Sequence, residues 1–186
     1  MNQLGKVFLS HKSEDKDFVR YVAEKIGIDR CHYDEYTFED GMNTLDEIMS
    51  ALDSTDLFIL FISDKALDSK WVKRERVRAK KLLDQGKIKQ IYPIIIDSNP
   101  AITYADERIP SWMREQYVIR RITSPKIAVQ KIKARLVELT WEIAPNLKNQ
   151  QTYFFGRNSE IEAFEQRRAN LDKPEMVCCV ASGFEG

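Results

Sequence analysis

The segment that most constrains the fold is a run of six apolar residues, Leu57 to Ile62. A strand with one face in water alternates apolar and polar residues, whereas this run is apolar at every position, so both of its faces must be buried. Strands of this kind lie at the centre of parallel sheets, because helices cover such sheets above and below. The run therefore predicts an α/β domain built around a central parallel strand.

Shorter apolar runs before and after this strand predict the rest of the sheet. These strands are expected at 7–10, 31–33, 91–96 and 117–119, and the second of them is weak. Pro93 has no backbone N–H to donate, so we expect its strand at an edge of the sheet or at a bulge. Together with the central strand, these runs predict a five-stranded sheet.

Amphipathic stretches between the strands predict the covering helices. Apolar residues recur at spacings of three and four in four stretches, 17–26, 45–52, 68–86 and 125–143. Gly27 is expected to end the first helix, and 100–112 has the composition of a loop. Because strands and helices alternate up to residue 145, we expect a flavodoxin-like α/β fold, with a central parallel five-stranded sheet and helices on both faces.

Composition excludes several classes of protein. Of the 186 residues, 43% are hydrophobic, which is enough for a core, and 29 basic residues balance 29 acidic ones. This balance argues against a nucleic-acid or anionic-membrane binder, and we expect neither partner. Cys31, Cys178 and Cys179 fit neither a disulfide framework nor a zinc site, so we expect a cytoplasmic protein. His11 and His32 lack partners at metal-ligand spacing, so no metal site is expected.

One acidic residue breaks the apolar pattern of the third expected helix. Glu75 lies three residues after Val72 and four before Ala79, on or beside the apolar stripe. Burying an unpaired carboxylate is costly, so Glu75 is either paired structurally, for example with Arg78, or retained for function. Trp71 precedes it by one turn and either belongs to the core or opens with the carboxyl group onto one crevice. Periodicity alone leaves these alternatives open.

Three ordered blocks of the chain resemble TIR domains. Val7 to Asp15 is similar to their opening strand and loop. Tyr33-Asp34, with Phe38 and Gly41, resembles their second strand and the following loop. The third block, Phe61-Ile62-Ser63 and Ser69-Lys70-Trp71 with Glu75, is similar to their third strand and the next helix. The resemblance covers roughly residues 5 to 143 and implies a TIR domain at 1–145.

In the enzymatic branch of this family, TIR domains cleave NAD⁺ between nicotinamide and ribose. The resemblance implies that Glu75 is the catalytic carboxylate, with NAD⁺ as the substrate and no cofactor. A single carboxylate suffices for this reaction, because nicotinamide leaves as a neutral amine and needs no proton from an acid. The positive charge that develops on the ribose is what a fixed anion would stabilise.

Five further residues follow from the resemblance as candidates for substrate binding. Lys12 would meet a phosphate, His11 a ribose, Trp71 would stack on nicotinamide, and Asp34 would hydrogen-bond the substrate. Phe38 would gate the pocket. Each also has an ordinary structural reading, as a solvated loop residue, a surface residue or part of the pocket wall.

The loop that holds Phe38 and Gly41 also mediates self-association in TIR domains. We therefore expect activation when several copies of the chain come together. The alternative is a non-catalytic TIR module that recruits another TIR protein through 34–43. A third possibility is a cyclic or transferred ADP-ribose product in place of simple hydrolysis.

The C-terminal segment resembles the start of a second domain. We expect a linker at 146–152, and 153–186 is similar to the entry segment of STAND and AAA-type NTPase domains, with Gly183 as the first glycine of a P-loop. The lysine of that motif does not follow, so no ATP site is expected here. These features imply part of a TIR–STAND protein similar to NLR-type receptors in prokaryotic defence against phage; an ordinary C-terminal strand is the alternative.

Overall fold

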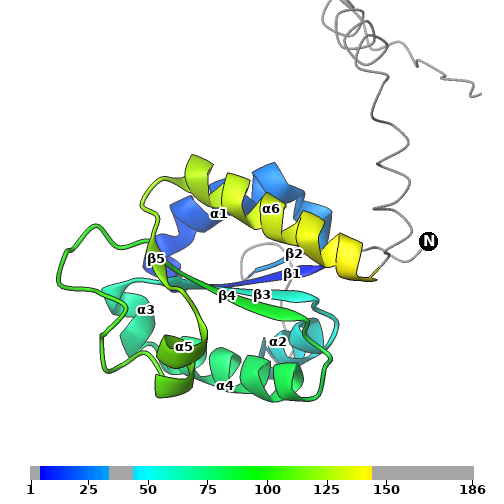
Figure 1. Ribbon diagram of the computed structural model, residues 1–186, viewed down its shortest axis with the longest axis horizontal. Coiled ribbons are helices and arrows are strands. Elements are labelled where there is room, and N and C mark those ends of the chain that lie inside the picture. The colour runs from blue at the N-terminus through cyan, green and yellow to red at the C-terminus, as the bar shows by residue number, and fades with distance from the viewer. Residues whose placement is uncertain (1–4, 34–43, 144–186) are drawn as a thin grey trace, which may run out of the picture. The chain divides into compact units, whose positions relative to one another are not determined.

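A five-stranded parallel sheet forms the centre of the computed structural model, which describes residues 5–33 and 44–143 (Figure 1). Its strands are β1 (Val7–Ser10), β2 (Cys31–His32), β3 (Leu57–Ile62), β4 (Gln90–Ile95) and β5 (Arg120–Arg121). They run in the order β2-β1-β3-β4-β5, and every neighbouring pair is parallel. This is the strand order of flavodoxin-like sheets, so the predicted fold class is confirmed.

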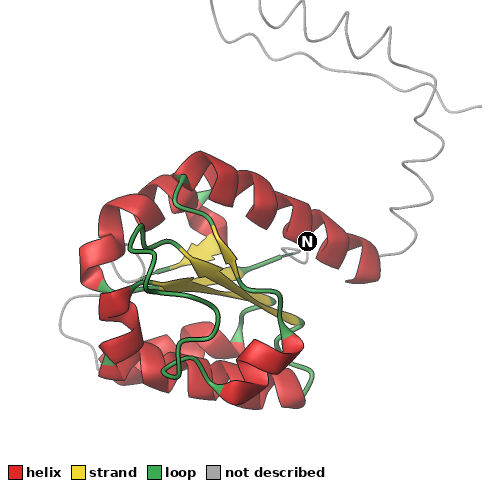
Figure 2. Cartoon of the chain, turned by 60° about the vertical axis from the view of Figure 1, so that its left-hand side comes forward, coloured by secondary structure: helices red, strands yellow, loops and turns green. Residues whose placement is uncertain are grey.

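Helices cover both faces of the sheet. They are α1 (Lys16–Ile26), α2 (Thr44–Asp53), α3 (Asp64–Asp68), α4 (Lys70–Asp84), α5 (Ser111–Gln116) and α6 (Pro125–Ile143). Short 3-10 turns occupy Ser13–Asp15 and Ile28–Arg30. Figure 1 shows α1 and α6 on one face of the sheet and the other four helices on the opposite face. In Figure 2 the strands accordingly lie between two layers of helices.

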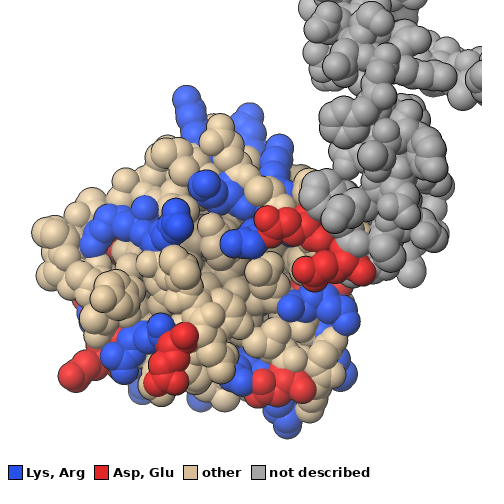
Figure 3. Space-filling model, viewed as in Figure 1, with Lys and Arg blue, Asp and Glu red and all other residues tan. Residues whose placement is uncertain are grey.

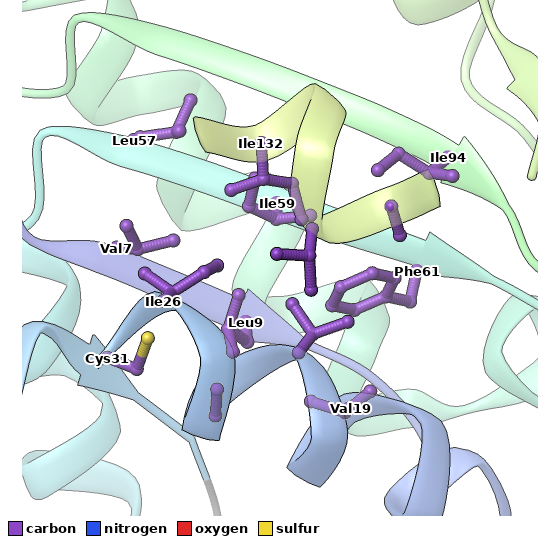
Figure 4. Close-up of a cluster of buried hydrophobic side chains, with 14 of the residues drawn as sticks. Val7, Leu9, Val19, Ile26, Cys31, Leu57, Ile59, Phe61, Ile94 and Ile132 are labelled. Carbon is purple, nitrogen blue, oxygen red and sulfur yellow. The ribbon is translucent and has the colours of Figure 1, made fainter. Parts of the chain in front are cut away.

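The central strand divides the core into two halves, as its sequence predicts. All six residues of β3 are buried. Leu57, Ile59 and Phe61 pack with residues of α1 and α6, in the cluster shown in Figure 4. The three alternate residues, Phe58, Leu60 and Ile62, pack with residues of α2, α4 and α5. Both faces of β3 are therefore in apolar contact with helices.

The predicted helix faces also reach the core. In α6, Ile132, Leu136 and Leu139 are buried against the sheet. Helix α1 ends at Ile26, and Gly27 follows with a φ of +117°. A side chain at this φ is strained, so glycine suits the position that ends the helix.

The expectation that Pro93 marks an edge strand or a bulge is wrong, because β4 is an inner strand and pairs with β3 residue by residue. Strand β4 lies between β3 and β5, and Pro93 is in register with Leu60 of β3. On the other side β5 pairs with Ile94 and Ile95 alone. The proline is tolerated because the described pairing to β5 begins one residue after it.

Three further features differ from the sequence predictions. The helix expected at 68–86 is α4, whose N-cap is Ser69, but the short helix α3 before it was not expected; the hydroxyl of Ser63 caps α3 through Ala66 N–H. The stretch expected to be a loop ends in α5, which begins at Ser111. The fifth strand was expected at 117–119, but β5 is formed by Arg120 and Arg121. Ile119, just before it, is buried in the core.

Several expectations fall on residues outside the described ranges. The linker at 146–152 and the NTPase fragment at 153–186 lie there, so both stay predictions. Within the part of the chain that the structure does describe, no helix combines the length and the apolar character that crossing a bilayer needs.

Candidate active site

A cavity of about 210 Å³ lies at the carboxyl ends of β1 and β2, next to the first two turns of α4. Parallel strands bring their carboxyl ends to one edge of the sheet, where α/β domains bind ligands. The described residues that line the cavity are apolar, hydroxyl-bearing, cationic and acidic: Phe8, Leu9, His11, Lys12, Ser13, Tyr33, Ile48, Ser69, Trp71 and Glu75. Four predicted site residues, Glu75, Trp71, Lys12 and His11, thus surround one space.

Glu75 is a buried carboxylate in the second turn of α4, with 8% of its surface exposed. Its Oε2 accepts a hydrogen bond from the hydroxyl of Ser10 at 2.5 Å. Arg78, the cation that periodicity offered as a partner, forms an ion pair with Asp53 at 2.6 Å. The carboxylate therefore lies on the inner side of the helix, at the cavity, and not at an exposed margin of the apolar stripe.

Trp71 stands at the rim of the cavity. Its side chain is 45% exposed, which excludes the reading that it is a core residue. The guanidinium of Arg74 lies 5.4 Å from the centroid of its ring, within the range of a cation–π contact. Trp71 and Glu75 line the same cavity, as their spacing of four residues predicts.

Lys12 and His11 belong to the loop that follows β1. The ammonium group of Lys12 lies 3.7 Å from the carboxylate of Glu14, so the side chain has a neighbouring counterion as well as a place at the cavity wall. Nδ1 of His11 is 2.9 Å from the carbonyl oxygen of Leu9. A carbonyl can only accept, so Nδ1 carries the hydrogen, and the ring is held against its own loop.

The reasoning from sequence missed the hydrogen-bond partner of Glu75, Ser10, and, among the residues of the cavity wall, Tyr33 and Ser69. Ser10 ends β1, and the signal for it was a hydroxyl closing an otherwise apolar strand. Tyr33 follows β2, is 1% exposed and lies 6.3 Å from His11 between ring centroids. Ser69 is both the N-cap of α4 and part of the cavity wall.

The remaining predicted site residues are not described by the structure. Asp34, Phe38 and Gly41 lie in the range 34–43, outside the described residues. Their assignment to the substrate pocket and to the self-association loop stays a prediction.

The described part of the chain offers a carboxylate and aromatic surface, but no cluster of metal ligands. Across 5–33 and 44–143, no three His, Cys, Asp or Glu side chains group closely enough to hold a metal ion. A buried carboxylate in a partly closed space stabilises a neighbouring positive charge more strongly than it would in water. The arrangement therefore suits a substrate on which positive charge develops.

Comparison with known proteins gives matches to a family and to solved structures. The chain is similar to the CMP N-glycosidase BcmB of Clostridium botulinum, with 16% identity and a TM-score of 0.47 over 70% of this chain and 98% of that chain. It is also similar to the TIR domains of the activated Roq1 resistosome that recognises the pathogen effector XopQ, with 19% identity and a TM-score of 0.47 over 75% of this chain and 76% of that chain. A search of curated proteins finds no match.

The family match concerns the whole described sheet. The model of the TIR domain family matches residues 7–121. This range begins at the first residue of β1 and ends at the last residue of β5. The chain therefore belongs to the TIR domain family.

Proposed function

We propose that this TIR domain cleaves the bond between nicotinamide and ribose in NAD⁺, with Glu75 as the catalytic carboxylate. The observation that carries the proposal is the position of Glu75, which is 8% exposed and lines a cavity together with Trp71. A domain that served only as a scaffold would have no physical need for a carboxylate at this point, because burying the charge costs free energy.

The reaction needs stabilisation of charge more than proton transfer. As the glycosidic bond breaks, the pyridinium nitrogen takes both bonding electrons and nicotinamide leaves as a neutral molecule. The ribosyl group is left with oxocarbenium character, and the anionic Glu75 stabilises it from a fixed position. Water then adds to the anomeric carbon and gives ADP-ribose, while capture by another nucleophile gives a cyclic or transferred product. The proposal covers cleavage and leaves the product open.

Neighbouring side chains have supporting roles in this proposal. The indole of Trp71 is half-exposed at the cavity rim and offers a flat face on which the nicotinamide ring stacks. Lys12 supplies positive charge for the pyrophosphate, and His11 contacts a ribose. Asp34 and Phe38 complete the proposed binding site from the loop outside the described residues.

We further propose that the activity depends on self-association. The loop with Phe38 and Gly41 would bring copies together, so that a neighbouring copy helps to order the pocket. A non-catalytic interaction module is the alternative function, and the two make different predictions for one assay.

The test incubates concentrated protein with NAD⁺ and measures nicotinamide by chromatography. Glu75→Gln keeps the size of the side chain and removes its charge, and Glu115→Gln is the matched control, because Glu115 is exposed on α5 and does not line the cavity. We expect release by the native chain and by the control, and loss of release in Glu75→Gln. A self-associated native sample that releases no nicotinamide would contradict the proposal and favour the interaction module.

A further inference from the structure

The hydrogen bond between Ser10 and Glu75 joins residues that are 65 positions apart in the sequence. Both residues are buried, with exposed fractions of 1% for Ser10 and 8% for Glu75. The distance between Ser10 Oγ and Glu75 Oε2 is 2.5 Å, in the range of a charge-assisted bond from a hydroxyl to a carboxylate. The sheet thus contacts the proposed catalytic group directly.

The two partners differ in how firmly they are held. Ser10 is the last residue of β1 and is in register with Leu60 of β3, so its backbone belongs to the ladder of the central sheet. Glu75 reaches the cavity from α4 through a side chain with several rotatable bonds. A donor on a rigid element therefore restricts the carboxylate more than the helix alone can.

We propose that Ser10 is a positioning residue, whose hydroxyl holds the Glu75 carboxylate in its working orientation at the cavity. This inference rests on the proposed function for its effect on catalysis, but the positioning itself is a property of the folded chain. Nothing in this role requires Ser10 to touch the substrate.

A second buried serine at the same edge of the sheet provides a matched control. Ser63 follows β3, is 5% exposed, and its hydroxyl donates to the carboxylate of Asp15 at 2.6 Å. It resembles Ser10 in burial, in its position after a strand and in its bond to a carboxylate. The hydroxyl of Ser63 donates to Asp15, whereas that of Ser10 donates to Glu75, so Ser63→Ala should affect stability and not the Glu75 carboxylate.

The first experiment observes the carboxylate without any reaction. The full chain is labelled with ¹³C at the glutamate carboxyl carbons, and the signal of Glu75 is assigned as the one that Glu75→Gln removes. In Ser10→Ala we expect this signal to shift, because the carboxylate has lost a hydrogen-bond donor. In Ser63→Ala we expect it to stay where it is in the native chain.

The second experiment measures nicotinamide release at saturating NAD⁺. Loss of a hydrogen bond to a charged group predicts that kcat falls about 10- to 100-fold in Ser10→Ala, with little change in KM. Ser10→Thr retains a hydroxyl and should recover most of kcat. Thermal unfolding of each variant checks that the fold is intact. The double variant Ser10→Ala with Glu75→Gln should be no slower than Glu75→Gln alone, since both changes act through one carboxylate.

The outcomes separate the positioning role from the proposed function. A shifted signal together with a lower kcat supports both. A shifted signal in Ser10→Ala, together with a native chain that releases no nicotinamide, supports the positioning role and contradicts the proposed function. An unmoved Glu75 signal in folded Ser10→Ala overturns the positioning role, whatever the rate. Failure of Ser10→Thr to recover kcat while its signal matches the native one also overturns it.

Discussion

Asp15 is a half-buried acid in the turn between the cavity loop and α1. Burial raises the pKa of its carboxyl above the ordinary value of 3.8, although the hydroxyl of Ser63 and the charge of His11 act in the opposite direction. Asp97 contributes to the rise through repulsion between like charges. At neutral pH the protein therefore holds this carboxylate against a desolvation cost.

The pH dependence of stability should show this cost. A raised pKa means that the folded state binds the proton more tightly, so the contribution of Asp15 to stability is present below pH 3.8 and is lost as the pH rises through the folded pKa. Asp15→Asn cannot titrate and keeps an oxygen that accepts from Ser63. We expect the free energy of unfolding of the native chain, relative to that of the variant, to fall as the pH rises through this range in urea titrations.

Asp97 provides a control of opposite sign. Hydrogen bonds from the backbone N–H groups of Asp64 and Asn99 lower the pKa of its carboxyl. Its contribution is present above pH 3.8 and is lost as the pH falls, so the native chain should lose its advantage over Asp97→Asn in acid. Slopes of the same sign for Asp15→Asn and Asp97→Asn would contradict this assignment.

The candidate site could be predicted in part from single residues. Glu75 was recognisable because it breaks an apolar stripe, and Trp71 follows from its spacing to that acid. The partner of Glu75 was not recognisable, since the contact with Ser10 depends on how β1 and α4 pack over 65 positions of sequence. Local patterns identify a polar residue at an apolar position, but long-range packing decides which group forms a hydrogen bond with it.

At the scale of elements, Arg121 ties the short strand β5 to the loop after β4. Its guanidinium donates to the backbone carbonyls of Asp97, Asn99 and Ile102, the last at 2.5 Å. One planar guanidinium with several N–H donors thus provides hydrogen bonds to three backbone carbonyls of a loop that is not part of the sheet. The neighbouring Arg120 shares the strand and is exposed.

Replacing Arg121 with lysine should loosen this loop. Lysine keeps the charge but lacks the several N–H donors that the guanidinium holds in one plane. We therefore expect the free energy of unfolding to fall by about 1 to 2 kcal/mol and amide exchange at 97–102 to speed up. Arg120→Lys is the control and should stay within about 0.5 kcal/mol of the native chain. Equal stability of the two lysine variants in urea titrations would refute the role given to Arg121.

The elements themselves were largely predictable, because each buries an apolar face with the period of a helix or a strand. The boundaries were less so. Strand β5 is an example, because it pairs through two exposed arginines that show no apolar alternation. The pairing of short strands depends on neighbours in space, which periodicity does not record.

At the scale of the whole molecule, basic and acidic residues balance at 29 each. Side chains of both signs lie on the face shown in Figure 3. Such a balance leaves little net repulsion between copies of the chain, which is compatible with the self-association that the proposed function invokes.

Self-association should make the activity depend on concentration. If a neighbouring copy helps to order the pocket, the rate of nicotinamide release per chain should fall on dilution, in step with the mass measured by light scattering. A rate per chain that stays constant while the oligomers dissociate would show that one copy suffices. That result would remove the requirement for association and leave the role of Glu75 untouched.

The most direct test of the central claim is the separation of kcat from KM in Glu75→Gln. The account places the Glu75 anion beside a charge that exists only as the bond breaks, so its loss should leave KM nearly unchanged and lower kcat about 100- to 1,000-fold. Glu115→Gln should match the native chain in both constants. A Glu75→Gln variant that turns over NAD⁺ at the native kcat would contradict the account.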